Sequence, residues 1–75
     1  MKELIEYIAR AIVDDPDAVE VTEEDAGEHL ILHLKVAEDD MGKVIGRQGR
    51  IAEAMRVLLR VSAVRSGTRA LLQIE

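Results

Sequence analysis

The 75-residue sequence contains no cysteine, tryptophan or phenylalanine, and only one tyrosine and one proline. Without cysteine, neither a disulfide framework nor a thiolate metal site can form, and the chain suits a reducing compartment. No apolar run approaches the roughly 20 residues that a transmembrane helix needs. Charged Glu3, Glu6 and Arg10 also interrupt any secretory signal near the start. We therefore expect a cytoplasmic protein that makes no membrane contact.

The residues for catalysis or metal binding are also missing. There is no cysteine nucleophile, no evident Ser-His-acid trio and no histidine pair on a predicted helix. His29 and His33 would stand roughly 13 Å apart on a strand, too far to share a metal, and both are interpreted as solvent-facing. The run from Gly42 to Gly46 lacks the GK[ST] ending of a P-loop. The sequence therefore predicts no enzyme activity, no metal site and no cofactor.

The charge is divided unevenly along the chain. Three basic against thirteen acidic residues give residues 1–40 a net charge of −10, whereas seven basic against two acidic residues give residues 41–75 a net charge of +5. A basic half suits a nucleic-acid-binding surface. The acidic half should repel nucleic acid and confine binding to one face of the molecule.

The N-terminal half predicts a helix and a hairpin within one compact domain, residues 1–75. The helix should end near Val13 or Asp14, because Pro16 cannot continue it. Tyr7 borders its apolar stripe and is interpreted as a half-buried packing residue, not as a base-stacking platform. The helical stripe consists of Leu4, Ile5, Ile8, Ala11 and Ile12. The hairpin is indicated by apolar alternation at Val19 and Val21, a turn at residues 24–27, and further alternation at Leu30, Leu32, Leu34 and Val36.

The C-terminal half predicts two helices and a last strand. Residues 38–40 offer an N-cap for a short helix from Met41 to Ile45. A longer helix should follow Gly49 and reach about Val64, and residues 70–75 should form the closing strand. The apolar face of the longer helix is predicted to hold Ile51, Ala54, Met55, Leu58, Leu59 and Ser62. On its other face, a solvated surface is favoured over phosphate contact for Arg56 and Arg60.

The segment GKVIGRQGRI, residues 42–51, lies between these helices. Gly46 and Gly49 bracket two polar residues, and a residue without Cβ lets a bulky ligand approach the main chain. The helix that follows would direct its free N–H groups and the positive end of its dipole at this loop. Nearby basic side chains add full charges. This combination suits a phosphate backbone, whereas a plain corner between two helices is the alternative for an isolated GxxG pattern.

In its surroundings, VIGRQGRI resembles the signature of KH-domain RNA-binding proteins, in which a GXXG loop clamps the nucleic-acid backbone. The predicted order of elements looks like the type II KH arrangement, αββααβ. The run GKVIGRQGRIAEAMRVLL is most similar to the small stand-alone bacterial KH proteins called KhpA. The resemblance implies an α+β fold with a three-stranded mixed sheet and helices packed on one face.

The resemblance also implies a function. The ligand would be single-stranded RNA, bound over about four nucleotides. The protein would act in post-transcriptional regulation or as an RNA chaperone, together with a second KH-containing protein. The binding residues would be Gly46, Arg47, Gln48 and Gly49 for the grip, Lys43 and Arg50 beside it, and Ile45 and Ile51 for the apolar floor. The strand from Leu30 to Val36 would form the opposite wall. A protein-interaction or self-association module with weak or no RNA binding is the alternative, indicated by Ile31, Val57 and Leu71.

Overall fold

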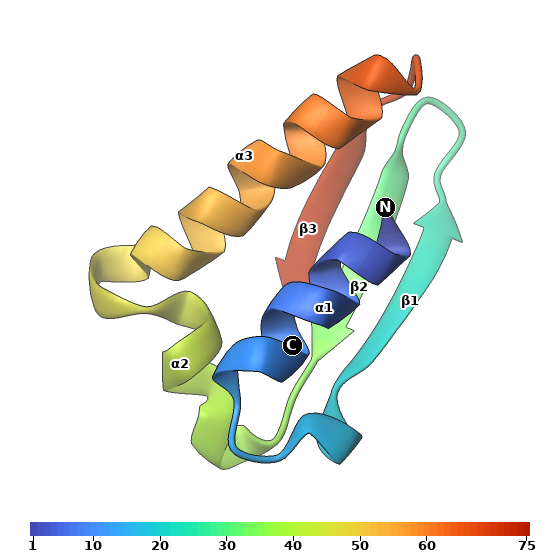
Figure 1. Cartoon of the computed structure of the whole chain (residues 1–75). Coiled ribbons are helices and arrows are strands. Elements are labelled where there is room, and N and C mark those ends of the chain that lie inside the picture. The colour runs from blue at the N-terminus through green and yellow to red at the C-terminus, as the bar shows by residue number, and fades with distance from the viewer.

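Three helices and three strands follow one another in the order helix, strand, strand, helix, helix, strand. The computed structural model describes all residues, 1–75. The elements are α1 (Lys2–Ile12), β1 (Glu20–Asp25), β2 (Leu30–Lys35), α2 (Met41–Ile45), α3 (Arg50–Arg65) and β3 (Ala70–Ile74) (Figure 1). Short 3-10 turns precede β1 (Pro16–Ala18), precede α2 (Glu38–Asp40) and join α2 to α3 (Arg47–Gly49).

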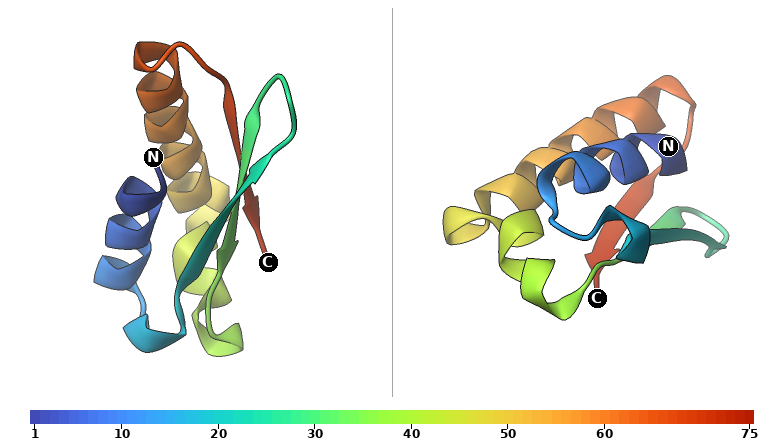
Figure 2. Two further views of the ribbon diagram at one scale, coloured as in Figure 1. Left: turned by 90° about the vertical axis from the view of Figure 1, so that its right-hand side faces the viewer. Right: turned by 60° about the horizontal axis from the view of Figure 1, so that its bottom comes forward.

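The strands form one mixed sheet in the order β1-β2-β3. β1 and β2 pair antiparallel through the hairpin, and β2 pairs parallel with β3, which the chain reaches by way of α2 and α3. The helices lie on the same side of the sheet, as the left view of Figure 2 shows. This architecture confirms the predicted α+β fold with the αββααβ order of a type II KH domain.

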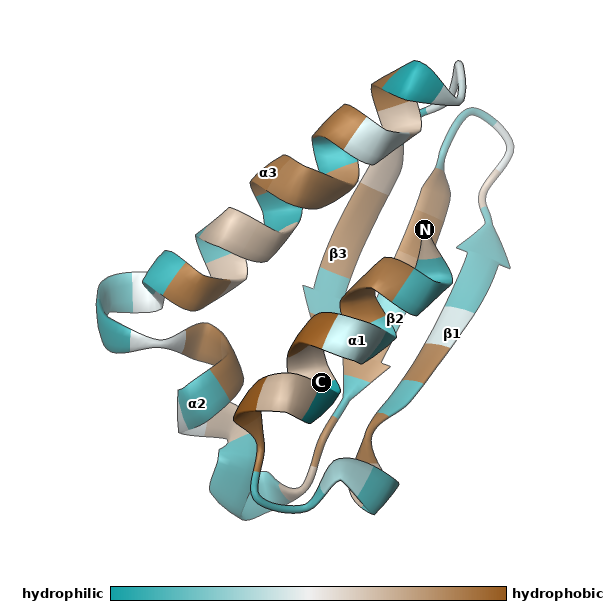
Figure 3. Cartoon of the chain, in the orientation of Figure 1, coloured by the Kyte–Doolittle hydropathy of each residue, from teal (hydrophilic) through white to brown (hydrophobic).

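The hydrophobic core fills the space between the helices and one face of the sheet. Leu32 and Leu34 on the central strand are fully buried, while the residues between and beside them face outward, as the predicted alternation requires. Figure 3 shows hydrophobic and hydrophilic residues alternating along β1 and around α1, whereas β3 is hydrophobic along most of its length. The core cluster comprises Ile5, Ala9, Val19, Val21, Leu32, Leu34, Val36, Val44, Met55, Leu59 and Leu72.

α1 differs from the prediction in three details, the first being that Ala11 of the predicted apolar stripe is exposed and Ala9 is buried instead. The helix ends at Ile12, with Val13 extended, so it is one residue shorter than the earlier of the two predicted ends. Tyr7 is 77% exposed, and the prediction that it packs half-buried is wrong. The buried face of α1 is centred on Ile5 and Ala9, and two helical positions turn the side chain of Tyr7 roughly 200° away from Ile5.

The buried face of α3 also differs from the predicted one. Met55 and Leu59 are in the core as expected, but Ile51 and Leu58 are 38% and 48% exposed. The buried positions of α3 are Ala52, Met55, Leu59 and Ala63. Apolar residues occur almost all around this helix, so periodicity alone does not define its core face. Ala52 and Ala63 are buried, whereas Ala54, which was predicted on the core face, is exposed. The contacts of the helix with α1, α2 and β3 decide which face is buried.

The end of α3 follows the predicted turn chemistry, but the hairpin turn lies later than the predicted residues 24–27, because Glu24 and Asp25 still belong to β1 and pair with β2. Gly67, with φ of 73°, ends α3, and the N–H of Thr68 donates to the carbonyl of Ala63 over 2.9 Å. In the hairpin loop, the N–H of Gly27 donates to the Asp25 carboxylate over 2.9 Å. No helix of the structure combines the length and apolar character that crossing a bilayer requires.

Candidate nucleic-acid interface

The loop between α2 and α3 has a strongly constrained backbone. Gly46 has φ of 77° and ψ of 175°, and Gly49 has φ of 75° in the left-handed region. Gln48, with φ of 58°, is the one residue other than glycine with positive φ in the chain. The N–H of Gly46 donates to the Gly42 carbonyl over 2.9 Å, and that of Gly49 to the Gly46 carbonyl over 3.2 Å. The positive φ angles of Gly46, Gln48 and Gly49 thus reverse the direction of the chain within four residues.

The two loop glycines have different surroundings. A Cβ on Gly46 would lie 2.8 Å from Cβ and 2.9 Å from N of Ile51, the second residue of α3, so the start of the helix packs directly on this glycine. A Cβ on Gly49 would meet nothing within 4 Å. Gly46 therefore serves the close approach of α2 and α3, whereas the space beside Gly49 is open to a ligand.

The arginines of the basic half are free of ion pairs. Arg47 and Arg50 are exposed, and neither lies within salt-bridge distance of an acid. The same holds for Arg56, Arg60, Arg65 and Arg69. These cations stay available to an external anion, and those nearest the loop stand where α3 presents the positive end of its dipole.

Lys43 differs from the arginines. Its ammonium forms an ion pair with Asp14 and lies 3.6 Å from Oδ1 of Asp40. The hydrogen bond to Asp14 is the main cause that raises the pKa of Lys43 above its usual value. The residue predicted to flank the RNA is thus held against two acids of its own chain.

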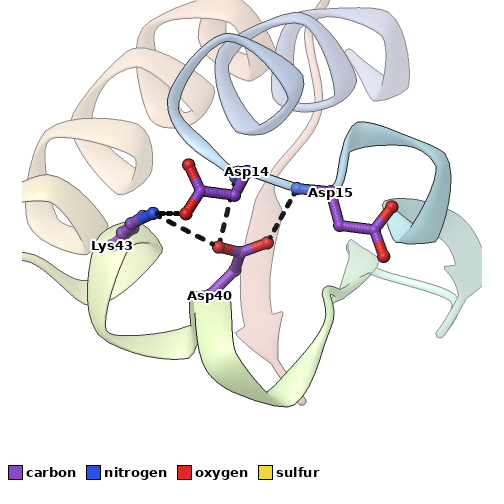
Figure 4. Close-up of polar contacts among 4 residues, drawn as sticks. All are labelled: Asp14, Asp15, Asp40 and Lys43. Carbon is purple, nitrogen blue, oxygen red and sulfur yellow. Dashed lines mark hydrogen bonds and ion pairs between the residues drawn. The ribbon is translucent and has the colours of Figure 1, made fainter.

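Asp40 is the only buried charged residue of the chain. It precedes α2 at the predicted N-cap position, yet its carboxylate makes no capping bond to that helix, so this part of the prediction is wrong. Instead it accepts the backbone N–H of Asp14 over 3.2 Å and that of Asp15 over 3.1 Å, as Figure 4 shows. Both bonds lower the pKa of Asp40 below its usual value, and the bond from Asp14 has the larger effect. The carboxylate thereby fastens the chain after α1 to the start of α2.

A groove runs between α3 and β3. Its first part is a cavity of about 320 Å³ lined by Ile31, Arg56, Leu59, Arg60, Ala70, Leu71, Leu72 and Gln73. A neighbouring cavity of about 280 Å³ shares Arg60, Ala70 and Leu71 with the first and extends it to Thr68 and Arg69. The groove thus has an aliphatic floor and guanidinium groups along its wall, a lining that fits nucleobases beside a phosphate chain.

The groove adds a surface that the sequence did not predict. Residues 30–36 were expected to form the wall opposite the helices, and of these Ile31 lines the first cavity, whereas the other strand residues of that cavity belong to the sheet edge β3. Ile45 and Ile51 are partly exposed near the loop and do not line either cavity. Arg56 and Arg60, for which a solvated surface was favoured, do line the first cavity, and their four-residue spacing on one helix face is the signal in the sequence that could have identified this wall.

The outer face of the sheet carries a cluster around His33. Its Nε2 lies 2.8 Å from Oε1 of Glu24 on β1, and its Nδ1 lies 3.3 Å from Oε1 of Glu75 at the end of β3. The contact with Glu24 is the main cause that raises the pKa of His33 above its usual value. His33 is therefore half-buried between two acids, not simply solvent-facing as predicted. No group of three potential metal ligands is arranged to hold an ion.

Comparison with known proteins places the chain in a family. The family model described as the KhpA/KhpB KH domain matches residues 2–74. A protein of Caldanaerobacter subterraneus named RNA-binding protein KhpA is 51% identical over 74 residues, which cover 99% of both chains. Proteins of the same name are 50% identical in Clostridium acetobutylicum, over 99% of both chains, and 58% identical in Treponema pallidum, over 97% of this chain and 91% of the relative. No solved structure matches. With its αββααβ fold and this similarity over nearly its whole length, the chain belongs to the KhpA/KhpB KH-domain family.

Proposed function

We propose that residues 1–75 form a single KH domain that binds single-stranded RNA at Gly46–Gly49 and in the groove between α3 and β3. The observation that carries the proposal is the exposed glycine loop with unpaired Arg47 and Arg50 at the N-terminal end of α3. Relatives that share about half of the sequence are named RNA-binding proteins. As a member of a KH-domain family, the chain is not an enzyme, in agreement with the prediction.

The phosphate backbone would lie against the loop. The open space beside Gly49 admits it to the main chain at the N-terminal end of α3, where the helix dipole is positive. Arg47 and Arg50 supply charge-assisted hydrogen bonds. KH domains clamp about four nucleotides in this way.

The bases would lie in the groove. Leu71 and Ala70 offer an aliphatic surface, and Arg56 and Arg60 stand beside it. Aromatic stacking plays no part, because the one aromatic residue, Tyr7, is on α1 and lines neither cavity of the groove. A groove that receives splayed bases selects single strands, since bases in a duplex are already paired. A cytoplasmic role in post-transcriptional regulation, as an RNA chaperone or with a second KH-containing protein, belongs to the same proposal.

The double substitution Arg47→Asp with Gln48→Asp tests the proposed site. Both side chains are exposed and both glycines stay in place, so the fold should persist. Two new negative charges facing phosphate should weaken the binding of a short unstructured RNA by at least about tenfold. Binding is measured by fluorescence anisotropy, and circular dichroism verifies the fold. Arg65→Asp with Ser66→Asp, exposed at the far end of α3, is the matched control. Wild-type affinity in a folded loop variant would refute the loop as the site.

A second candidate function is protein interaction, favoured by an exposed apolar stripe on α3. Val57, Val61 and Val64 are 43%, 53% and 70% exposed and follow one another at helical spacing, with Leu58 beside them. Such a stripe on the outer side of a helix suits packing against another helix. The partner would be a second copy of the chain or another KH-containing protein, and the assembly would form without RNA.

A further inference from the structure

The seven basic residues of the C-terminal half fall into two groups. Six arginines are unpaired, whereas Lys43 is held by Asp14 and Asp40. Asp40 is 2% exposed and accepts two backbone N–H groups from residues more than twenty positions away in the sequence. Lys43 and Asp40 thus belong to one contact that joins α2 to the segment after α1 (Figure 4).

α2 is short, and apart from its contacts at Met41, Val44 and Gly46 it has few other means of fixing its position. It contains only five residues, Met41–Ile45, and Val44 is its only fully buried side chain. Gly46 follows directly and begins the loop, so any tilt of α2 moves the loop with it. The bonds from Asp40 to the chain at Asp14 and Asp15 supply a second point of attachment at the opposite end of α2 from the loop.

The geometry points to Asp40 as a positioning residue for the glycine loop, with Lys43 closing the same clamp instead of contacting RNA. We define this clamp as Asp14, Asp15, Asp40 and Lys43. The inference rests on the proposed RNA-binding function and assigns residues that act on it indirectly. It replaces the expectation that Lys43 flanks the ligand. A buried, fully bonded carboxylate holds one geometry, because releasing it would leave polar groups unsatisfied.

The direction in which RNA affinity changes when Asp40 loses its charge distinguishes a positioning role from a direct electrostatic effect on RNA. Removing an acid near an anion-binding loop should, by charge alone, strengthen RNA binding. We expect the reverse for Asp40→Asn, which keeps the shape of the side chain but loses its charge and one of its acceptor oxygens. RNA affinity should fall roughly fivefold at a temperature where the protein is fully folded. Asp39→Asn is the matched control, because Asp39 is the exposed preceding residue and makes no ion pair. It should bind RNA as tightly as the wild type or more tightly.

The salt dependence of binding tests the role of Lys43. Each phosphate contact on a single strand contributes a slope of about −0.7 in log K against log salt concentration. Arg47→Gln should reduce the magnitude of the slope by about that amount. Lys43→Gln should leave the slope unchanged while lowering the urea midpoint of unfolding. Lys43 is exposed, so this variant should fold even if Asp40→Asn does not.

NMR of the RNA-free protein examines the clamp without any ligand. In Asp40→Asn, the amide signals of Gly46 and Gly49 should shift, and in Asp39→Asn they should not. The inference is overturned if Asp40→Asn leaves these signals in place, if it binds RNA as well as Asp39→Asn, or if Lys43→Gln reduces the salt slope as Arg47→Gln does. Failure of the proposed function gives a different result: Arg47→Gln and the loop double variant would bind RNA like the wild type, while the glycine signals still report the clamp.

Discussion

Gly46 and Gly49 have different structural roles, although they are identical residues in the same loop. Both need a positive φ, but only Gly46 is in tight contact, with Ile51 at the start of α3. Substituting Gly46 therefore affects both the backbone conformation and the packing of two helices. Substituting Gly49 affects the backbone conformation and the space offered to a ligand.

We expect Gly46→Ala to destabilise the fold more than Gly49→Ala. A left-handed conformation costs an alanine about 1–2 kcal/mol, which applies to Gly49. At Gly46 the crowding against Ile51 adds about 1–3 kcal/mol. Urea unfolding at constant pH measures both variants. Equal losses, or a smaller loss for Gly46→Ala, would contradict the assignment of Gly46 to helix packing.

At the scale of the elements, His33 connects all three strands. It lies on the central strand, Glu24 is on β1, and Glu75 follows β3. The backbone N–H of Glu75 also donates to the Leu34 carbonyl over 2.8 Å, so the end of the chain continues the pairing with β2. Protonated His33 attracts both carboxylates and so holds the two edges of the sheet to its centre.

This arrangement predicts a pH-dependent stability. The pKa of His33 is raised in the folded state above the ordinary value of 6.5. A raised histidine pKa stabilises the fold fully below the unfolded pKa, and the contribution is lost as the pH rises through the folded pKa. The urea midpoint should therefore fall as the pH rises above about 6.5. In His33→Gln this fall should be absent. His29→Gln, the matched control, should keep it, because His29 makes no ion pair. An unchanged fall in His33→Gln would exclude His33 as its source.

At the scale of the whole molecule, the acidic and the basic side chains lie on different parts of the structure. The acids are concentrated on β1, its hairpin and the turns before β1 and α2, whereas the unpaired arginines follow the loop, α3 and the groove. Val57 and Val61 line neither cavity of the groove, whereas Val64 lines the second one. The valine stripe and the groove therefore meet at Val64.

The valine stripe predicts assembly that does not require RNA. Sedimentation velocity after nuclease treatment should show a species larger than one chain, or a copurifying protein. Val61→Lys places a charge in the middle of the stripe and should reduce that assembly by at least about tenfold. Tyr7→Lys, at an exposed position on α1, is the control and should leave assembly intact. A monomeric wild type without any copurifying protein would count against the interaction function.

The local chemistry of the sequence was sufficient to predict the helices, the strands and the glycine loop. Leu32 and Leu34 alternate with polar residues, Pro16 stops α1, and Gly67 ends α3; each acts through its own backbone or its nearest neighbours. The element order αββααβ and the position of α2 were therefore predictable. The glycine loop was also recognisable, because its residues are contiguous and their conformational preferences are local.

Only the tertiary structure decided which surfaces meet. α3 carries apolar residues on nearly every side, and its core face is the one that contacts α1, α2 and β3. The groove wall belongs to β3 because strand order depends on the crossover through two helices, not on the strand's own residues. Lys43 lies in a basic segment of the sequence, yet Asp14, twenty-nine residues earlier, takes up its charge. Contacts between distant segments depend on the path of the whole chain, and a local pattern carries no information about that path.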